Sequence, residues 1–192
     1  MLTLYYSPGS SSLAVHIALN EVSATFDAKP LTLEKDTRSP AFRAVNPNGK
    51  VPVLMIDGRP LTEVAGCLFY LARAYPQAKL LPANDPEAEA QVVSWMSFIA
   101  SGIHPSRQAG PERVREVWQV AETRLGGKEW AVGAYSIADI HLFRLYWRFR
   151  GPLELKAEDY PGIHGHYERM LARPAVKKTL EAEEKITSSL PR

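Results

Sequence analysis

Hydrophobic and polar positions change their repeat near the middle of the chain. Up to about residue 75, short β-prone runs alternate with segments whose apolar positions recur on one helix face. This alternation predicts the order β-α-β-α-β-β-α. Strands are expected at 2–6, 25–33, 51–56 and 59–61, and helices at 13–21, 39–44 and 64–75. Pro30 suits an edge strand, and Asp57-Gly58 is a hairpin turn signal.

Beyond this region only helical repeats remain. The stretch 76–86 contains three prolines and no periodicity, so we expect a linker at 77–85. The sequence therefore predicts an α/β domain over residues 1–76 and an all-α helical domain over residues 86–192.

Helix-start signals divide the second domain. Asp85 is a suitable N-cap, and a helix is expected from Pro111 to about Leu125. Ser136 and Asp139 have capping-box spacing, and the helix after them is apolar nearly all round, which predicts burial at the domain centre. Two shorter helices are expected to open at Tyr160-Pro161 and Arg173-Pro174.

Composition restricts the class of protein. The chain has 192 residues, 45% of them hydrophobic and 23% charged, with a formal net charge of +2. This charge and the lack of a basic block predict no nucleic-acid partner. A single cysteine excludes an intramolecular disulfide framework and favours a reducing compartment. We expect neither a signal peptide nor a membrane span, and hence a cytoplasmic protein.

The stretch YYSPGSSSLAVH (5–16) raises a chemical question. Ser10, Ser11 and Ser12 follow a Pro-Gly turn and precede a helical run. Serines are preferred N-caps, so the row can simply start a helix. A hydroxyl at a helix N-terminus can also stabilise an anion, because the helix dipole and free N–H groups add to its hydrogen bond. The residues alone leave both roles open.

Five motifs in order resemble one known family. They are YYSPGSSSLAVHIALNE at the start, NPNGKVPVL (46–54), LTEVAGCLFYLA (61–72), SIADI (136–140) and RPAV near the end. Together they resemble the glutathione S-transferases, most closely the bacterial beta class, over nearly the whole chain. The resemblance implies a thioredoxin-like first domain that binds glutathione as co-substrate without a metal. It also implies a second domain that forms part of a pocket for a small-molecule electrophile, and a homodimer.

The resemblance implies a catalytic role for the serine row. A thiol with a pKa of about 8.5 is only about 3% thiolate at neutral pH, so it must be stabilised as the anion. The beta class usually has cysteine where this chain has Ser11, and Tyr6 and Ser12 match residues near the sulfur. Serine cannot form a mixed disulfide but can stabilise a thiolate. This difference favours conjugation, or binding without chemistry, over thiol–disulfide exchange.

The resemblance also implies a set of glutathione-binding residues. Pro52 matches a cis-proline that exposes the backbone of Val51, and Lys50 precedes them. Glu63 matches an acidic residue that faces the γ-glutamyl group, although Val64 follows where serine is usual. From the residues alone, Glu63 could equally complement the dipole of its helix.

A further match lies in the second domain. His104 matches a histidine that projects toward the active site, but Pro105 replaces the usual lysine, for which Lys50 or Arg107 could substitute. His104 could also be a helix C-terminal residue before a helix-stopping proline.

Several alternatives remain at this stage. Departures at Ser11, Val64 and Pro105 support a non-catalytic glutathione-binding or scaffold protein as the main alternative. A disulfide reductase is disfavoured because no thiol lies at the helix start. A maleylacetoacetate-isomerase-like function ranks lower, because that class typically has arginines where Ala14 and His16 stand.

Three other groups of reactive residues have simpler interpretations. His164 and His166 could suggest a metal, but a solvated loop is favoured. Ser11, His16 and Asp139 are the residue types of a hydrolase triad, without a nucleophile-elbow motif, and His16 is expected at the surface. Cys67 is expected to be a buried, inert thiol.

Overall fold

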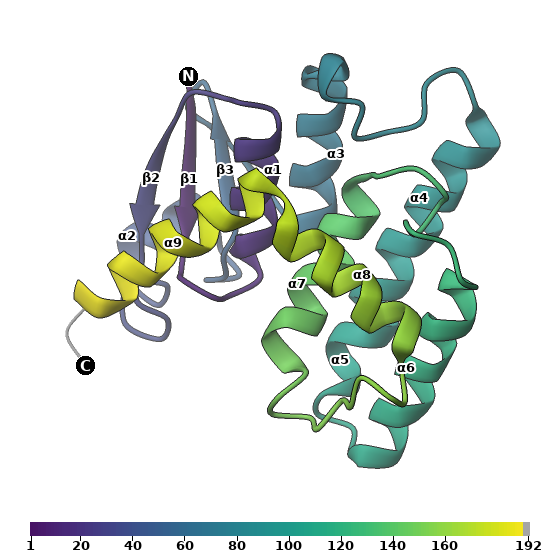
Figure 1. Ribbon diagram of the computed structural model, residues 1–192. Coiled ribbons are helices and arrows are strands. Elements are labelled where there is room, and N and C mark those ends of the chain that lie inside the picture. Colours follow the sequence, from purple (N-terminus) through teal and green to yellow (C-terminus); the bar gives the residue numbers. More distant parts are fainter. Residues whose placement is uncertain (190–192) are drawn as a thin grey trace. The chain divides into compact units, whose positions relative to one another are not determined.

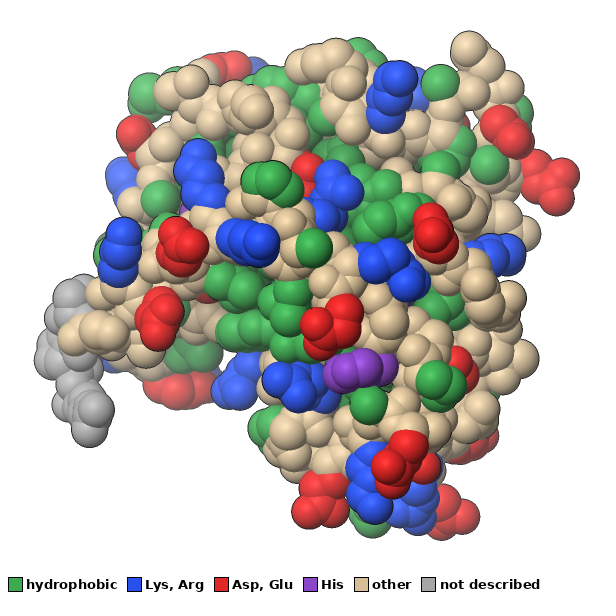
Figure 2. All heavy atoms as spheres, viewed as in Figure 1, with side chains coloured by type: hydrophobic (Ala, Val, Ile, Leu, Met, Phe, Trp, Pro, Cys, Tyr) green, Lys and Arg blue, Asp and Glu red, His purple; other side chains and the backbone are tan. Residues whose placement is uncertain are grey.

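The computed structural model describes residues 1–189, and the first seven elements follow the predicted order (Figure 1). Contacts divide the chain into two compact units, Ala72–Arg173 and the remainder. The last three residues of the predicted second domain, 190–192, lie outside the described part. Basic and acidic side chains are mixed across the face shown in Figure 2.

The first unit is built on a four-stranded mixed sheet. Its strands are β1 (Leu2–Tyr6), β2 (Phe26–Pro30), β3 (Val53–Ile56) and β4 (Arg59–Thr62). They lie in the order β2-β1-β3-β4, with β1 parallel to β2 and antiparallel to β3. Pro30 thus lies on an edge strand, as predicted, where its missing N–H costs no ladder hydrogen bond.

Four helices belong wholly or mainly to this unit. They are α1 (Ser12–Glu21), α2 (Pro40–Val45), α3 (Val64–Ala74) and α9 (Pro174–Ser189). The buried core includes Leu4, Leu13, Ile17, Leu54 and Leu68. This core fixes α1 and α3 against the sheet, which sets the positions of both helix starts.

The C-terminal helix differs from its expected place and length. It has 16 residues and is not a short helix, and it groups with the first unit rather than with the preceding helices. It packs on α1, where Asn20 Nδ2 donates to Thr179 Oγ1 at 2.9 Å. The predicted domain boundary assumed that each domain is one continuous stretch of the chain. No local sequence pattern indicates that α9 packs on the first unit.

The second unit consists of helices within its described residues. They are the short η1 (Pro76–Ala78), α4 (Pro86–Phe98), the π-helical η2 (Ile99–Ile103), α5 (His104–Ser106), α6 (Pro111–Leu125), α7 (Ile137–Phe149) and α8 (Pro161–Ala172). Three sequence predictions are confirmed: Asp85 caps α4, Ser136 and Asp139 form a capping box, and α7 is buried from Ile137 to Tyr146.

Helical structure continues through Pro105. The π-helical turn η2 leads directly into α5. The helical structure therefore does not end at His104, which one interpretation of the sequence expected. A proline lacks an N–H and crowds the preceding turn, and a wider π-helical turn can accommodate both effects.

A carboxylate from one helix caps the start of another. Glu122 on α6 accepts hydrogen bonds from the backbone N–H of Gly162 at 2.8 Å and of Ile163 at 2.9 Å. A Cβ at Gly162 would lie 2.7 Å from Glu122 Oε1, so only glycine fits this approach without a shift.

Replacing Glu122 with alanine is expected to lower the free energy of unfolding by about 2 kcal/mol, because two helix N–H groups lose a charged acceptor. Urea denaturation would measure the change. Glu116→Ala is the matched control, since Glu116 is exposed on the same helix and forms an exposed ion pair with Arg113. Its expected change is within about 0.5 kcal/mol, and equal changes for the two variants would contradict the capping role.

Candidate functional site

Three loop segments meet at one end of the sheet. Tyr5 on β1 lies opposite Val53 on β3, which in turn lies opposite Thr62 on β4, and both pairings are antiparallel. The end of β1, the start of β3 and the end of β4 therefore lie together. The segments just beyond these ends are 7–11, 51–52 and 63–64. Sheet topology thus brings most of the predicted site residues together.

Ser11 contacts the backbone that was expected to bind a peptide. Its Oγ donates a hydrogen bond to the carbonyl oxygen of Val51 at 3.1 Å, and its side chain is half-buried. The Val51–Pro52 peptide bond is cis, which confirms what the resemblance implied. The strand pairings of β3 begin at Val53, so the sheet does not use the backbone of Val51.

The other serines of the row are used within the loop. Ser12 is fully buried; its Oγ donates to the carbonyl of Ser7, and accepts from the Ser7 N–H and the Ser10 hydroxyl. These bonds use the full capacity of one hydroxyl. Ser10 Oγ in turn accepts from the N–H of Ser12 at 3.2 Å. Ser10 and Ser12 therefore hold the helix start, and Ser11 is the serine that faces Val51.

A compact turn delivers Lys50 and Val51 to the site. The side chain of Asn46 donates to the carbonyl of Lys50 at 2.7 Å and accepts from the N–H of Asn48 at 3.1 Å. Gly49 has a φ of +59°, and a Cβ there would lie 2.7 Å from the carbonyl oxygen of Thr37. The Lys50 side chain is exposed, and we find no ion pair for it within residues 1–189.

Glu63 has an unusual backbone conformation at the start of α3. Its φ is +67°, which non-glycine residues rarely adopt and which clusters at functional sites. Its carbonyl accepts from the N–H of Cys67 at 3.0 Å, so the first turn of α3 directs free N–H groups beyond Glu63. Glu63 is exposed and Val64 half-buried, and the helix start can bind a carboxylate through its backbone without a hydroxyl at Val64.

A buried carboxylate from α9 holds the loop before the serine row. Glu183 Oε2 accepts from the N–H of Gly9 at 2.8 Å, and Oε1 lies 2.8 Å from His16 Nδ1. Both residues are only 4% exposed, so the expectation that His16 lies at the surface is wrong. The His16 ring packs edge-on between Tyr6 and Phe26, at 5.1 and 5.7 Å between centroids.

Tyr6 belongs to this buried network in the described structure. Its pKa is raised by burial and, to a lesser extent, by the negative charge of Glu183, so the phenol stays protonated at neutral pH. Sequence analysis missed Gly9, His16 and Glu183. No local pattern marks Glu183 among the other acidic residues of α9, because its partners lie 167 and 174 positions away.

His104 is the predicted site residue that lies in the second unit. Its ring packs against Phe149 at 6.3 Å between centroids, and its carbonyl accepts from Arg107 Nη1 at 3.0 Å. Its predicted role toward glutathione stays a prediction.

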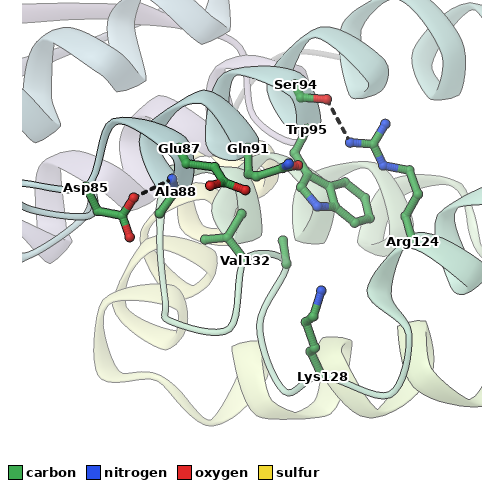
Figure 3. Close-up of a pocket in the computed structure, with 10 residues that line it drawn as sticks. Asp85, Glu87, Ala88, Gln91, Ser94, Trp95, Arg124, Lys128 and Val132 are labelled. Carbon is green, nitrogen blue, oxygen red and sulfur yellow. Dashed lines mark hydrogen bonds between the residues drawn. The ribbon is translucent and has the colours of Figure 1, made fainter.

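A separate cavity of about 530 Å³ lies within the second unit (Figure 3). The guanidinium of Arg124 stacks over Trp95 at 4.7 Å and donates to Ser94 Oγ at 3.0 Å, and Lys128 lines the opposite side. None of the predicted site residues lines this cavity.

The other reactive residues have structural surroundings. Burial is the main cause that raises the pKa of Cys67 to about 12, which confirms an inert thiol. His164 and His166 lie on α8 and not in a solvated loop, and His166 Nε2 lies 3.0 Å from Asp139 Oδ1 in the interior.

Two features are absent from the described residues. Residues 1–189 contain no group of three or more His, Cys, Asp or Glu side chains suited to hold a metal ion. No helix in that range is both long and apolar enough to cross a membrane.

Comparison with known proteins fits this geometry. The family model described as glutathione S-transferase, N-terminal domain matches residues 10–74, and the corresponding C-terminal domain model matches residues 71–174. The chain belongs to the glutathione S-transferase family. It is a glutathione S-transferase-like enzyme whose mixed-sheet domain and helical domain form the fold of that family.

Individual relatives narrow the class. Glutathione S-transferase GstA of Escherichia coli O157:H7 is 31% identical over 95% of this chain and 98% of its own length. A sphingomonad glutathione S-transferase solved with glutathione is 32% identical, with a TM-score of 0.86 over 95% of this chain and 98% of that one. A bacterial beta-class enzyme of Sphingomonas chungbukensis is also 32% identical, with a TM-score of 0.84 over 94% of this chain and 98% of that one. The chain is thus most similar to beta-class-like bacterial enzymes.

Proposed function

We propose that this enzyme conjugates reduced glutathione to an electrophilic small molecule, with the thiolate stabilised by the hydroxyl of Ser11. The observation that carries the proposal is the 3.1 Å hydrogen bond from Ser11 Oγ to the carbonyl of Val51. It places a rotatable donor at the start of α1, beside a backbone segment that the sheet does not use.

The surrounding residues suit a tripeptide with two carboxylates. The backbone of Val51 can pair with an extended cysteinyl unit, as in strand addition. The start of α3 after Glu63 offers N–H groups to a carboxylate, and the exposed Lys50 offers a cation. When the peptide pairs with Val51, Ser11 can turn its hydroxyl to the sulfur, where the start of α1 also favours negative charge.

Supporting roles divide among the neighbouring residues. Ser12 and Tyr6 act by holding the loop and the helix start, since the Ser12 hydroxyl is fully used and Tyr6 packs on His16. We further propose that the protein is a cytoplasmic homodimer, as is typical of the family.

Replacing Ser11 with alanine is expected to lower the rate of conjugation with a nitroaryl chloride at least tenfold, because the thiolate loses its hydroxyl donor. The pKa of bound glutathione, followed by ultraviolet thiolate absorbance against pH, should rise in the same variant. Ser11→Thr is the matched control, since it retains the hydroxyl and should keep most of the rate.

Calorimetric titration with reduced glutathione separates the candidate functions. Micromolar to low-millimolar binding with turnover supports conjugation. Binding without turnover of any electrophile would indicate the non-catalytic glutathione-binding or scaffold protein. An unchanged rate and thiol pKa in Ser11→Ala would overturn the role of this hydroxyl.

A further inference from the structure

One wall of the cavity in Figure 3 is a single face of α4. Glu87, Gln91 and Ser94 line it and follow one another at spacings of four and three residues, which places them on one side of the helix. Trp95 also lines the cavity and is otherwise buried. All the lining residues lie between positions 85 and 132, so the cavity belongs to the second unit alone.

The opposite wall comes from the end of α6 and the turn after it. Gly126 and Gly127 follow the helix with φ values of +57° and +73°, so the chain leaves α6 in a left-handed turn. The N–H of Lys128 then donates to the carbonyl of Leu125 at 3.0 Å. This hydrogen bond holds the backbone from which the Lys128 side chain points into the cavity (Figure 3).

Arg124 presents a positioned guanidinium at one end of the cavity. Its guanidinium carbon lies 4.7 and 4.9 Å from the ring centroids of Trp95 and Phe98, and its Nη2 donates to Ser94 Oγ at 3.0 Å. The side chain is half-buried, and this burial lowers the pKa of Arg124 from its usual value. A guanidinium has five N–H donors, so donors beyond the one that binds Ser94 are available to an anion.

Opposite charges line this cavity without pairing. Within residues 1–189, none of Glu87, Arg124 and Lys128 forms an ion pair. Ser94, which binds the guanidinium, lies two helical turns from Glu87, which is about 10 Å along α4. Asp85, the N-cap of α4, adds negative charge at the Glu87 end (Figure 3). Charges held apart in this way favour a ligand that carries the complementary charges at its own two ends.

We propose that this cavity binds a small zwitterion of dipeptide size, with its ammonium group at Glu87 and its carboxylate at Arg124 and Lys128. Two extended residues span about 7 Å, and a charged hydrogen bond of about 2.8 Å at each end brings them to groups on both sides. A guanidinium suits the carboxylate because its N–H groups bind both oxygens in parallel.

The size and lining of the cavity fit such a ligand. Its volume of about 530 Å³ lies within the range of small-molecule sites. The apolar side chains of Ala88, Ala131 and Val132 line it and can contact the body of the ligand between its charged ends. The inference does not depend on the proposed conjugation, because neither Ser11 nor Val51 lines the cavity.

Three forms of one dipeptide test the proposal on the full chain. Alanyl-phenylalanine carries both charges, its N-acetyl form lacks the ammonium group, and its C-terminal amide lacks the carboxylate. Each is titrated calorimetrically into the protein without glutathione. The zwitterion is expected to bind about tenfold more tightly than either capped form, since each cap leaves one charged end of the cavity without a partner. Equal affinities, or no heat from the zwitterion at about 10 mM, would overturn the proposal.

Substitutions at the two ends should affect different forms of the dipeptide. Glu87→Gln is expected to weaken the zwitterion about tenfold and the N-acetyl form, which has no ammonium group, by less than about twofold. Arg124→Gln and Lys128→Gln should each weaken the zwitterion and the N-acetyl form but not the amide. Lys128 is exposed, so this variant keeps the test decisive if Arg124→Gln disturbs the packing on Trp95. Equal losses for all three forms would contradict the assigned orientation.

Matched controls come from the same two helices. Glu89 on α4 and Arg113 on α6 do not line the cavity, and they form ion pairs with Arg73 and Glu116. Glu89→Gln and Arg113→Gln should therefore leave the affinity for the zwitterion unchanged. A loss in these variants equal to that in Glu87→Gln and Lys128→Gln would indicate a general effect of surface charge and overturn the site.

A glutathione titration separates this site from the proposed function. Reduced glutathione is also a zwitterionic peptide, so it is titrated into the wild type and Arg124→Gln. We expect unchanged glutathione affinity in Arg124→Gln and unchanged dipeptide affinity in Ser11→Ala. Dipeptide binding that passes these tests supports the cavity site even if no electrophile is conjugated. If Arg124→Gln weakens glutathione while the three dipeptide forms bind equally, the cavity holds glutathione and the dipeptide assignment is wrong.

Discussion

Replacing Asp139 with alanine is expected to lower the free energy of unfolding by about 3–5 kcal/mol. The carboxylate is fully buried and accepts four hydrogen bonds. Oδ1 accepts from the N–H of Ala131 at 2.7 Å and from His166 Nε2 at 3.0 Å. Oδ2 accepts from the N–H of Ser136 at 2.8 Å and from its hydroxyl at 3.1 Å. A carboxylate offers about four acceptor positions, so all are used.

The size of this effect follows from what the substitution leaves behind. Alanine would leave four buried donors without partners, and each orphaned group costs about 1–3 kcal/mol before the structure relaxes. The loss also releases the start of α7, the central helix of its unit, from both the preceding loop and α8. Urea denaturation would measure the stability, and the fluorescence of Trp130, whose ring packs on His166 at 5.8 Å, would report the local change.

Asp85→Ala is the matched control for this prediction. Asp85 is also an N-cap aspartate of the second unit, but it is exposed and accepts one hydrogen bond, from the N–H of Ala88. Asp85→Ala should lower the free energy of unfolding by about 1 kcal/mol. If Asp139→Ala costs no more than Asp85→Ala, then the buried network does not hold α7 as the contacts suggest.

Local sequence rules predicted the elements well, because neighbouring residues determine them. The hairpin turn, the edge strand with Pro30 and the caps at Asp85 and Ser136 all depend on chemistry within four positions along the chain. The rules failed for α9, because its packing on α1 depends on contacts between residues far apart. They also missed the passage of the helix through Pro105, which required a π-helical turn before it.

The candidate site, like the fold, could be predicted from the sequence only in part. The resemblance implied roles for Ser11, Val51 and Glu63, and sheet register explains why these separate segments meet. It could not tell which of three adjacent serines faces Val51, because that depends on how Ser7 satisfies its backbone groups. Nor could it place His16 in the core, because its buried partner lies on the last helix.

Replacing Glu183 with alanine is expected to lower the free energy of unfolding by about 3–5 kcal/mol and to lower kcat. The variant removes the acceptor of the Gly9 N–H and of His16 Nδ1 in the interior. Gly9 lies two positions before Ser11, so the loop that sets the Ser11 hydroxyl loses its anchor to α9. A small displacement of a positioned group can reduce a rate substantially.

Glu183→Gln separates positioning from charge. Its amide oxygen can still accept from Gly9, and its amide N–H can donate to Nδ1 of His16 once the ring adopts the other tautomer. We therefore expect Glu183→Gln to retain most of the stability and of the kcat that Glu183→Ala loses. Because the Glu183 charge raises the pKa of Tyr6, that pKa should fall in Glu183→Gln, although burial still holds it above its usual value.

The matched control and a spectroscopic measurement complete this test. Glu184 is exposed on the same helix, so Glu184→Ala should change stability by less than about 0.5 kcal/mol and leave kcat unchanged. Tyrosine labelled with carbon-13 at the phenol carbon would report the pKa of Tyr6 by its chemical shift. If Glu183→Ala loses stability but keeps kcat, α9 stabilises the fold without positioning Ser11. If both fall and Gln restores both, the last helix of the chain positions the serine near its start.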